Sequence, residues 1–211
     1  MGDSHDPLVS RRDVLKRVGV AGAAAAMPIQ AIAQATRQPF ETLTPAEGAT
    51  LEAIVPRLIP TDANGPGAAE ARAARYIDRA LGGFLASSRD AYRTGLAGIE
   101  TYARTAKGMA FTQLTAQEQD AVLTDMERNA AKGFTVAPFF FNLVLSHTIQ
   151  GTFCDPFYGG NANFVGWDLI GYPGIRLTAS ANDQRMDVSP KPTHMSAYDF
   201  SMFARKKPDA R

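Results

Sequence analysis

The chain has 211 residues, of which 45% are hydrophobic, 20% are charged and 9% are aromatic, and its formal net charge is +1. This composition provides the apolar side chains of a globular core and excludes fibrous and low-complexity proteins. The near-neutral charge predicts no nucleic-acid partner, because such proteins carry a basic face, and a single cysteine excludes a disulfide framework or a multi-cysteine metal site within the chain.

Residues 1–35 have the features of an export signal. Arg11 and Arg12 stand at its head, an uncharged run rich in Ala and Gly covers residues 18–36, and small-x-small cleavage sites lie at residues 31–35. A basic region, a short apolar region and such a site define a signal peptide, and adjacent arginines indicate the twin-arginine (Tat) type. The alternative is an apolar helix that stays attached as an anchor, although the run is short for a membrane span.

The Tat route exports proteins that are already folded, commonly because a cofactor has been inserted. The sequence contains no GxGxxG motif that opens a helix after a strand and no CxxCH motif for haem attachment. We therefore expect either that the chain has a cofactor site that motifs do not reveal, or that it carries a folded partner across the membrane.

Residues 36–152 are predicted to form a domain of the all-α class, a small helical bundle. A capping box at Thr44 and Glu47 starts the first helix. Pro56 is expected to kink or end this helix near Val55, because proline removes a helical hydrogen bond.

Three further segments carry apolar residues at helical spacing. They cover residues 68–81, residues 84–105, and a segment that starts at a second capping box, Thr115 and Glu118, and ends at Gly133. The charged residues of the first of these segments are interpreted as a solvated face: Arg72, Arg75, Asp78 and Arg79.

Residues 138–149 are apolar nearly all round, which predicts the central buried helix of the bundle. His147 lies in this segment. We interpret it as a buried histidine with a hydrogen-bond partner rather than a catalytic base, because a lone imidazole needs further groups to do chemistry.

Residues 153–211 are predicted to form a long irregular extension, rich in Gly and aromatic residues, that wraps a partner and ends in a tail. Within residues 151–174 the density of Gly, Pro, Asn and Asp favours irregular backbone, whereas the many aromatic residues argue against disorder. Large aromatic side chains on such a segment are held either under the domain or against a partner. In the tail, five apolar residues either dock on the partner or fold back: Met195, Tyr198, Phe200, Met202 and Phe203.

The motif Gly-x-Phe-Cys-Asp-Pro-x-Tyr-Gly-Gly-Asn at residues 151–161, followed by Gly-Trp-x-x-Ile-Gly-Tyr-Pro-Gly at residues 166–174, resembles the gluconate 2-dehydrogenase subunit 3 family. The twin-arginine head and the Leu-Thr-Pro-x-Glu helix start at residues 43–47 also match it. The resemblance implies a non-catalytic small (gamma) subunit of a periplasmic, membrane-associated sugar or polyol dehydrogenase, located at the inner membrane.

The same resemblance implies the partners. The catalytic large subunit is a flavoprotein of the glucose–methanol–choline type that carries FAD, and a multihaem cytochrome c subunit often accepts its electrons. The small subunit binds no flavin or haem c itself. It is expected to supply the signal for the Tat translocase and to assist the folding, export and stability of the flavoprotein.

Five residues are candidate partner contacts under this resemblance: Cys154, Asp155, Tyr158, Trp167 and Tyr172. For Cys154 we expect either an intersubunit disulfide with the flavoprotein or a buried, inert thiol. Asp155 and Trp167 either anchor the partner or lock the loop onto the helical body.

Two other functions stay open from the sequence. The first is a stand-alone periplasmic enzyme that uses Asp62, Asp155, His147 or His194, although no cluster of titratable residues is evident. The second is a sugar-binding module in which Trp167 and Tyr158 stack on the ligand. The sequence names no substrate for the complex.

Overall fold

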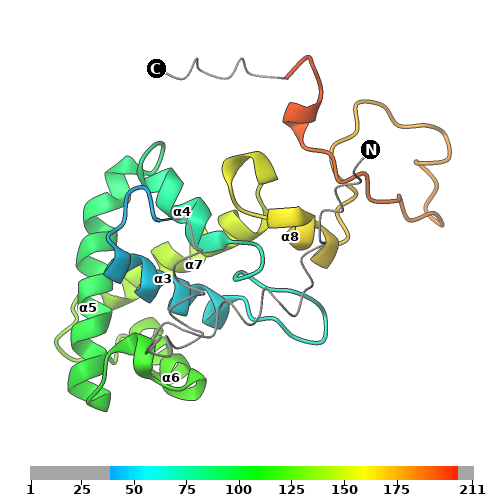
Figure 1. Cartoon of the computed structure of the whole chain (residues 1–211). Helices are drawn as coiled ribbons and strands as arrows, with labels where there is room; N and C mark the ends of the chain where they lie inside the picture. The colour runs from blue at the N-terminus through cyan, green and yellow to red at the C-terminus, as the bar shows by residue number, and fades with distance from the viewer. Residues whose placement is uncertain (1–38, 204–211) are drawn as a thin grey trace, which may run out of the picture. The chain divides into compact units, whose positions relative to one another are not determined.

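A computed structural model describes residues 39–203 of the chain (Figure 1). The chain divides into two units between Gln38 and Pro39, and the described residues all belong to the second unit. The predicted export signal, with Arg11 and Arg12, lies outside the described residues.

The described residues form α-helices joined by loops and short 3₁₀ turns, with no β-strand among them, which confirms the all-α prediction. Along the chain of residues 39–203 the helices are α3 (Pro45–Leu58), α4 (Ala73–Leu81), α5 (Arg89–Lys107), α6 (Ala116–Glu127), α7 (Ala137–Phe153) and α8 (Val165–Leu169). None of the helices in this part of the chain is long and apolar enough to cross a membrane.

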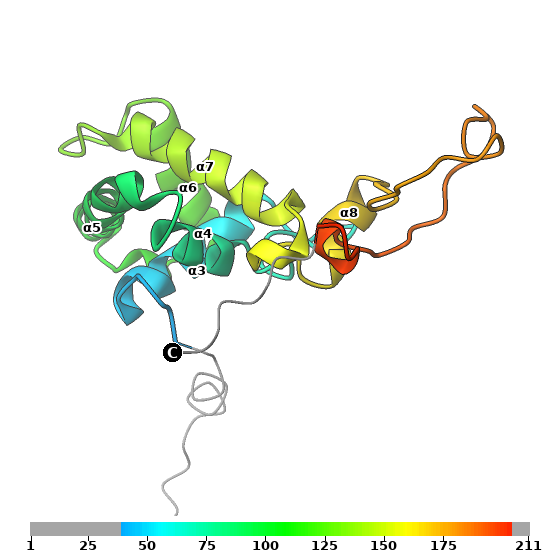
Figure 2. The same cartoon turned by 90° about the horizontal axis from the view of Figure 1, so that it is seen from above.

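Helix α7 is the centre of the bundle, as its apolar sequence predicts. It contacts α3, α4, α5 and α6, and Figure 2 shows it running across the other helices. The largest fully buried side chains come from the helices α3 to α7 and from the turn after α5: Leu51, Ile54, Ile77, Leu81, Tyr92, Leu96, Ile99, Phe111, Met126 and Phe140.

The contact between α5 and α7 is unusually close. A Cβ atom built on Gly95 would lie 2.2 Å from the ring of Phe140, so only glycine fits there. Next to it, the Tyr92 hydroxyl and His147 Nδ1 share a hydrogen bond of 3.0 Å. His147 is buried, and burial lowers its pKa. It is therefore the buried, partnered histidine that the sequence predicts.

Helix boundaries differ from the predicted ones in identifiable ways. α3 continues through Pro56 to Leu58 instead of ending near Val55, because Pro56 lies in the last turn and the Ile59 N–H still reaches the Val55 carbonyl at 3.1 Å. α6 ends at Glu127 rather than at Gly133, with Asn129 in a left-handed conformation soon afterwards.

Helix α4 begins later than predicted and buries a charge. Asp78 is only 1% exposed, and its carboxylate accepts hydrogen bonds from the backbone N–H groups of Glu41, Thr42 and Leu43 at 2.6, 2.9 and 2.8 Å. The interpretation of Asp78 as part of a solvated face is therefore wrong, because the segment before α3 covers this side of α4. A hydrogen bond to a charged group contributes about 1.5–3 kcal/mol to the free energy of unfolding. These three bonds therefore hold residues 41–43, at the beginning of the folded domain, against α4.

Candidate functional site

The segment after α7 is more ordered than its composition predicts. α7 ends at Phe153, and two 3₁₀ turns, η3 (Pro156–Tyr158) and η4 (Ala162–Phe164), lead into the short helix α8. Gly160 lies so close to the end of α7 that a Cβ atom there would be 2.1 Å from the Gly151 carbonyl oxygen. The segment is thus folded against the end of α7.

Asn161 is the residue that holds this segment together, and it was not among the candidate residues from the sequence. It is fully buried, its side-chain amide donates to the Cys154 carbonyl at 2.8 Å, and its side-chain oxygen accepts from the Gly166 N–H at 2.8 Å. Its own N–H donates to the Gly151 carbonyl. Its backbone is left-handed, with φ of 44°, a conformation that asparagine tolerates better than most residues.

The Trp167 side chain is buried under the segment and is not exposed on its surface. The side chain is 4% exposed, and its indole N–H donates to the Phe153 carbonyl at 3.0 Å. Its ring packs edge-on against Tyr172 and at an angle against Phe164. Trp167 therefore locks the loop onto the end of α7, which is one of the two roles that the sequence left open, and a direct partner contact stays a prediction.

Asp155 joins the segment to the tail. One carboxylate oxygen accepts from the Phe157 N–H and the Ser196 hydroxyl at 2.9 and 2.7 Å, and the other accepts from the Ala197 N–H at 2.9 Å. The tail thus folds back onto the loop at this point, and Asp155 is already engaged within the chain. Contact of Asp155 with a partner is not tested by this geometry and stays a prediction.

An exposed aromatic cluster, here called the aromatic face, consists of Phe157, Tyr158 and Tyr198. The rings of Phe157 and Tyr198 stack with centroids 3.8 Å apart, and the hydroxyls of Tyr158 and Tyr198 share a hydrogen bond of 2.7 Å. Phe157 and Tyr158 are nevertheless 47% and 43% exposed. Because Tyr198 comes from the tail, the aromatic face exists only when the tail is docked.

A second tail contact lies at the other end of the segment. His194 Nε2 lies 2.8 Å from an Asp168 carboxylate oxygen, and its ring stacks on Phe164. Thr193 bonds the Pro173 carbonyl through both its N–H and its hydroxyl. Residues 176–192 consequently form a loop that leaves the body beyond α8 and returns to it (Figures 1 and 2).

Cys154 is half-buried, and its thiol lies beside Gly160 and the Gly151 carbonyl. Burial raises the pKa of the Cys154 thiol to about 11, with the negative charge of Asp155 as a smaller contribution. As the only cysteine of the chain, it has no intramolecular partner for a disulfide. The thiol is therefore protonated at neutral pH, and it reacts more slowly than a free thiol while the segment is folded in this way.

The residues of the stand-alone enzyme hypothesis do not converge. Asp62 lies in the loop before α4, and His147 pairs with Tyr92 inside the bundle. Asp155 binds Ser196 and Ala197 of the tail, and His194 pairs with Asp168 beside α8. Among residues 39–203, no group of three or more His, Cys, Asp or Glu side chains is placed to hold a metal ion. These side chains thus form no common site in the part of the chain that the structure describes.

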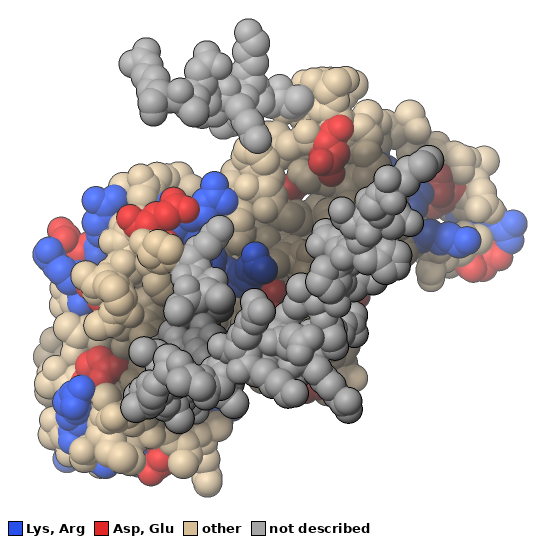
Figure 3. Space-filling view, in the orientation of Figure 1, with Lys and Arg blue, Asp and Glu red and all other residues tan. Residues whose placement is uncertain are grey.

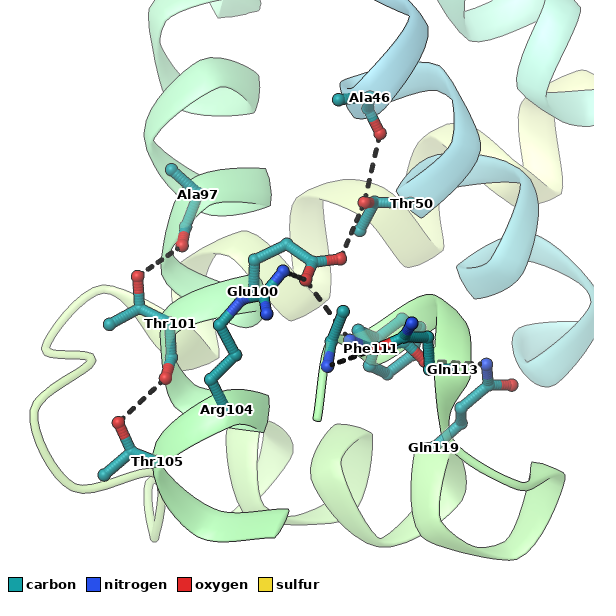
Figure 4. Close-up of polar contacts among 11 residues, drawn as sticks. Ala46, Thr50, Ala97, Glu100, Thr101, Arg104, Thr105, Phe111, Gln113 and Gln119 are labelled. Atoms are coloured by element: carbon teal, nitrogen blue, oxygen red, sulfur yellow. Dashed lines mark hydrogen bonds and ion pairs between the residues drawn. The ribbon is translucent and has the colours of Figure 1, made fainter. Parts of the chain in front are cut away.

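A groove of about 370 Å³ lies elsewhere, between α3 and α5, and Glu100 lines it. Its carboxylate accepts hydrogen bonds from the Thr50 hydroxyl at 2.9 Å and the Phe111 N–H at 3.2 Å, and Arg104 lies 3.9 Å away (Figure 4). These contacts join α3, α5 and the turn after α5, so Glu100 serves the packing of the bundle.

Surface charge does not single out a binding region. On the face drawn in Figure 3, acidic and basic side chains are interspersed over the described residues. In the loop of residues 176–192 the charges pair with each other, as in the Arg176–Asp183 ion pair at 2.8 Å. The aromatic face is therefore the most distinctive exposed feature of the segment around Cys154.

A family model for gluconate 2-dehydrogenase subunit 3 matches residues 45–174. The chain belongs to this family. The match runs from the start of α3 to Gly174, shortly after the end of α8, so it includes the Asn161 contacts and Phe157 and Tyr158. No curated protein and no solved structure gives a significant match. The gluconate 2-dehydrogenase subunit 3 family is named for a subunit of a dehydrogenase complex, and we describe the chain as such a subunit.

Proposed function

We propose that this chain is the non-catalytic small subunit of a periplasmic, membrane-associated dehydrogenase complex that oxidises a sugar or polyol. The catalytic partner is an FAD-containing flavoprotein of the glucose–methanol–choline type, and a multihaem cytochrome c accepts its electrons. One observation carries the proposal: Phe157 and Tyr158 of the aromatic face lie within the region that matches the family, and they are exposed on a loop whose polar groups are engaged within the chain.

Exposed aromatic rings on an ordered loop are better suited to bind a protein partner than the same rings on a flexible tail would be. Aromatic side chains are the commonest anchors of binding energy, because they bury a large area with few rotatable bonds. The ordering of the loop by Asn161, Trp167 and Asp155 lowers the conformational entropy that binding must remove. The aromatic face would therefore contact the flavoprotein, and Trp167 and Asp155 would support it from below.

The export role rests on residues 1–35. In this proposal the Arg11–Arg12 pair brings the complex to the Tat translocase, which carries the folded, FAD-loaded flavoprotein together with this chain into the periplasm. The flavoprotein is expected to lack a signal of its own. FAD, when bound to that partner, accepts a hydride from the substrate, and the residues of this chain take no part in that step.

Cys154 is proposed to form a disulfide with a cysteine of the flavoprotein in the oxidising periplasm, where two thiols lose two electrons and two protons to a thiol oxidase. The raised pKa slows this reaction in the isolated chain. Gels of the purified complex run with and without reductant decide the point. A single band at the summed mass only without reductant supports the disulfide, and unchanged mobility contradicts it.

Co-expression with a candidate flavoprotein, followed by pull-down on this chain and dye reduction with sugars, tests the proposal as a whole. We expect a yellow, active complex, and we expect periplasmic activity to disappear when Arg11 and Arg12 are changed to Lys. Recovery of the chain alone, with the flavoprotein active and exported without it, would contradict the proposal. Direct binding of a sugar by the isolated chain would instead support the alternative, a sugar-binding module.

A matched pair of variants tests the aromatic face. Tyr158→Ala removes an exposed ring of the face, whereas Phe139→Ala removes a comparably exposed ring on α7. We expect Tyr158→Ala to reduce the recovered flavoprotein about tenfold or more, as for an interface hot spot, and Phe139→Ala to leave recovery unchanged. Equal recovery with both variants would place the interface elsewhere.

A further inference from the structure

The five residues from Pro39 to Leu43, which follow the export signal, are all held against the helical body. The three N–H groups of residues 41–43 donate to the buried Asp78 carboxylate of α4. One turn earlier on α4, the Arg75 guanidinium donates to the Pro39 carbonyl at 2.7 Å and lies 4.2 Å above the Phe40 ring. Five consecutive residues are thus fixed by contacts from one face of α4.

Phe40 adds a packing contact to these polar ones. Its ring lies against α3 at Gly48, where a Cβ atom would be only 2.1 Å from the ring, so the ring occupies the space that any other residue would fill. Release of residues 39–43 would expose this ring to water and remove three hydrogen bonds from the Asp78 carboxylate. Such a segment opens rarely in the folded protein, because each hydrogen bond to a charged group contributes more to stability than one between neutral groups.

The cleavage site of the predicted signal is close to this fixed segment. Only residues 36–38 separate Ala35 from Pro39, and three residues span at most about 11 Å when fully extended. A peptidase binds its substrate as an extended chain on both sides of the bond that it cuts. An enzyme that binds the chain on both sides of the bond after Ala35 therefore needs residues within a few positions of the fixed segment 39–43, and its binding competes with the contacts that hold this segment.

We propose that the contacts between α4 and residues 39–43 protect the small-x-small site at residues 33–35 from signal peptidase, so that the export signal stays attached to the exported chain. This inference rests on the proposed function, because it presupposes that residues 1–35 act as the signal. The protection is a property of the folded chain, since Asp78 and its three donors are more than thirty residues apart in the sequence.

The decisive variant keeps the contacts and moves the cleavage site. An insertion of about ten Gly and Ser residues between Gln38 and Pro39 adds a flexible reach of roughly 17 Å. The chain is co-expressed with the flavoprotein, recovered from the periplasmic side, and its intact mass is measured. We expect the wild-type chain to keep residues 1–35, and the ratio of cleaved to intact chain to rise about tenfold or more in the insertion variant, as for a bond freed from a folded region.

A second pair of variants tests Asp78 directly. Asp78→Asn replaces an oxygen that accepts backbone N–H groups by an amide that donates, and we expect more cleavage than in the wild type. Glu100→Gln is the control, because the Glu100 carboxylate on α5 also accepts a backbone N–H, from Phe111 (Figure 4), but its hydrogen-bond donors are Thr50 and Phe111 and not residues 39–43. Its chain should stay intact. Equal cleavage of both variants would mean that general stability, not the α4 contact, controls processing.

The outcomes separate this inference from the proposed function. An exported wild-type chain that starts at Gln34 or Thr36, cleaved as completely as the insertion variant, overturns the inference and leaves the export role intact. A chain that does not reach the periplasm, or reaches it equally well after Arg11 and Arg12 are changed to Lys, overturns both.

Discussion

At the scale of single residues, the side chains that hold distant segments of the fold together are polar groups that hydrogen-bond to the backbone. Asp78 accepts three N–H groups of the segment before α3, and Asn161 bonds both the end of α7 and the start of α8. The sequence predicts neither, because a helix pattern does not show which distant segment covers a charged side chain. It does predict the buried, partnered state of His147, since the apolar surroundings of that residue are local in the sequence.

Asp78→Asn should lower the free energy of unfolding by about 2–4 kcal/mol, because at least one backbone N–H then faces an amide donor in a buried place. Urea denaturation followed by circular dichroism measures the change. Glu100→Gln, at a half-buried carboxylate, should cost about 1 kcal/mol or less. A loss for Asp78→Asn no larger than for Glu100→Gln would contradict the assigned role.

Cys154 should react slowly with iodoacetamide. With the pKa raised to about 11, the thiolate fraction at pH 8 is roughly two orders of magnitude below that of a free thiol, and the greater nucleophilicity of the more basic thiolate restores only about a factor of ten. We therefore expect alkylation of the native chain at least about tenfold slower than in urea. Comparable rates would show that the thiol is not held as described.

The same shift gives a pH dependence of stability. Because the folded chain binds the thiol proton more tightly than the unfolded chain, this contribution to stability is fully present below about pH 8.5 and is lost as the pH rises toward 11. Cys154→Ala should flatten the decline over this window in denaturation experiments. An identical decline in the variant would assign it to other groups, such as Tyr76, whose pKa burial raises to about 12.

At the scale of elements, the helices could be predicted where their signals are local. The capping boxes at Thr44 and Thr115 mark the starts of α3 and α6, and the apolar run marks α7. The segment after α7 could not be predicted, because left-handed backbone at Asn161, Asn163 and Phe164 and contacts with the tail set its path. Such features depend on tertiary structure.

Gly95→Ala tests the close packing of α5 on α7. The new methyl would meet the ring of Phe140, which is buried. We expect a loss of about 1–3 kcal/mol from overpacking, despite the gain of roughly 1 kcal/mol in helix propensity. Gly83→Ala is the control, because a Cβ atom there meets nothing closer than 3.9 Å. Calorimetry on both variants compares them.

Truncation before Thr193 tests the tail as an element. It removes the donors to Asp155 and the Tyr198 ring, yet leaves the bundle of α3 to α7 complete. We expect the melting temperature to fall by no more than about 4 °C, while recovery of the flavoprotein falls as strongly as for Tyr158→Ala. Truncation after Phe203 is the control and should change neither quantity. Full recovery without the tail would exclude Tyr198 from the interface.

At the scale of the whole molecule, the proposed interface is aromatic and the surface charges are mixed. Association driven by apolar contact depends weakly on ionic strength, whereas steering by charge is screened within about 10 Å at 0.1 M salt. We expect capture of the flavoprotein to change less than about threefold between 0.1 and 0.5 M NaCl. A steep loss of capture over this range would indicate a charged interface instead.

Because the tail returns to the loop, the helices can form before the aromatic face while the chain is being synthesised. Domains form from the N-terminus onward as the chain leaves the ribosome, so the helices from α3 to α7 emerge before residues 193–198. Tyr198 and the two tail groups that bind Asp155, the Ser196 hydroxyl and the Ala197 N–H, lie within these residues. An incomplete translation product consequently lacks the aromatic face even when its helices have formed. The ribosome must therefore pass Tyr198 before the aromatic face can form, and copies that end earlier would lack the proposed interface with the flavoprotein.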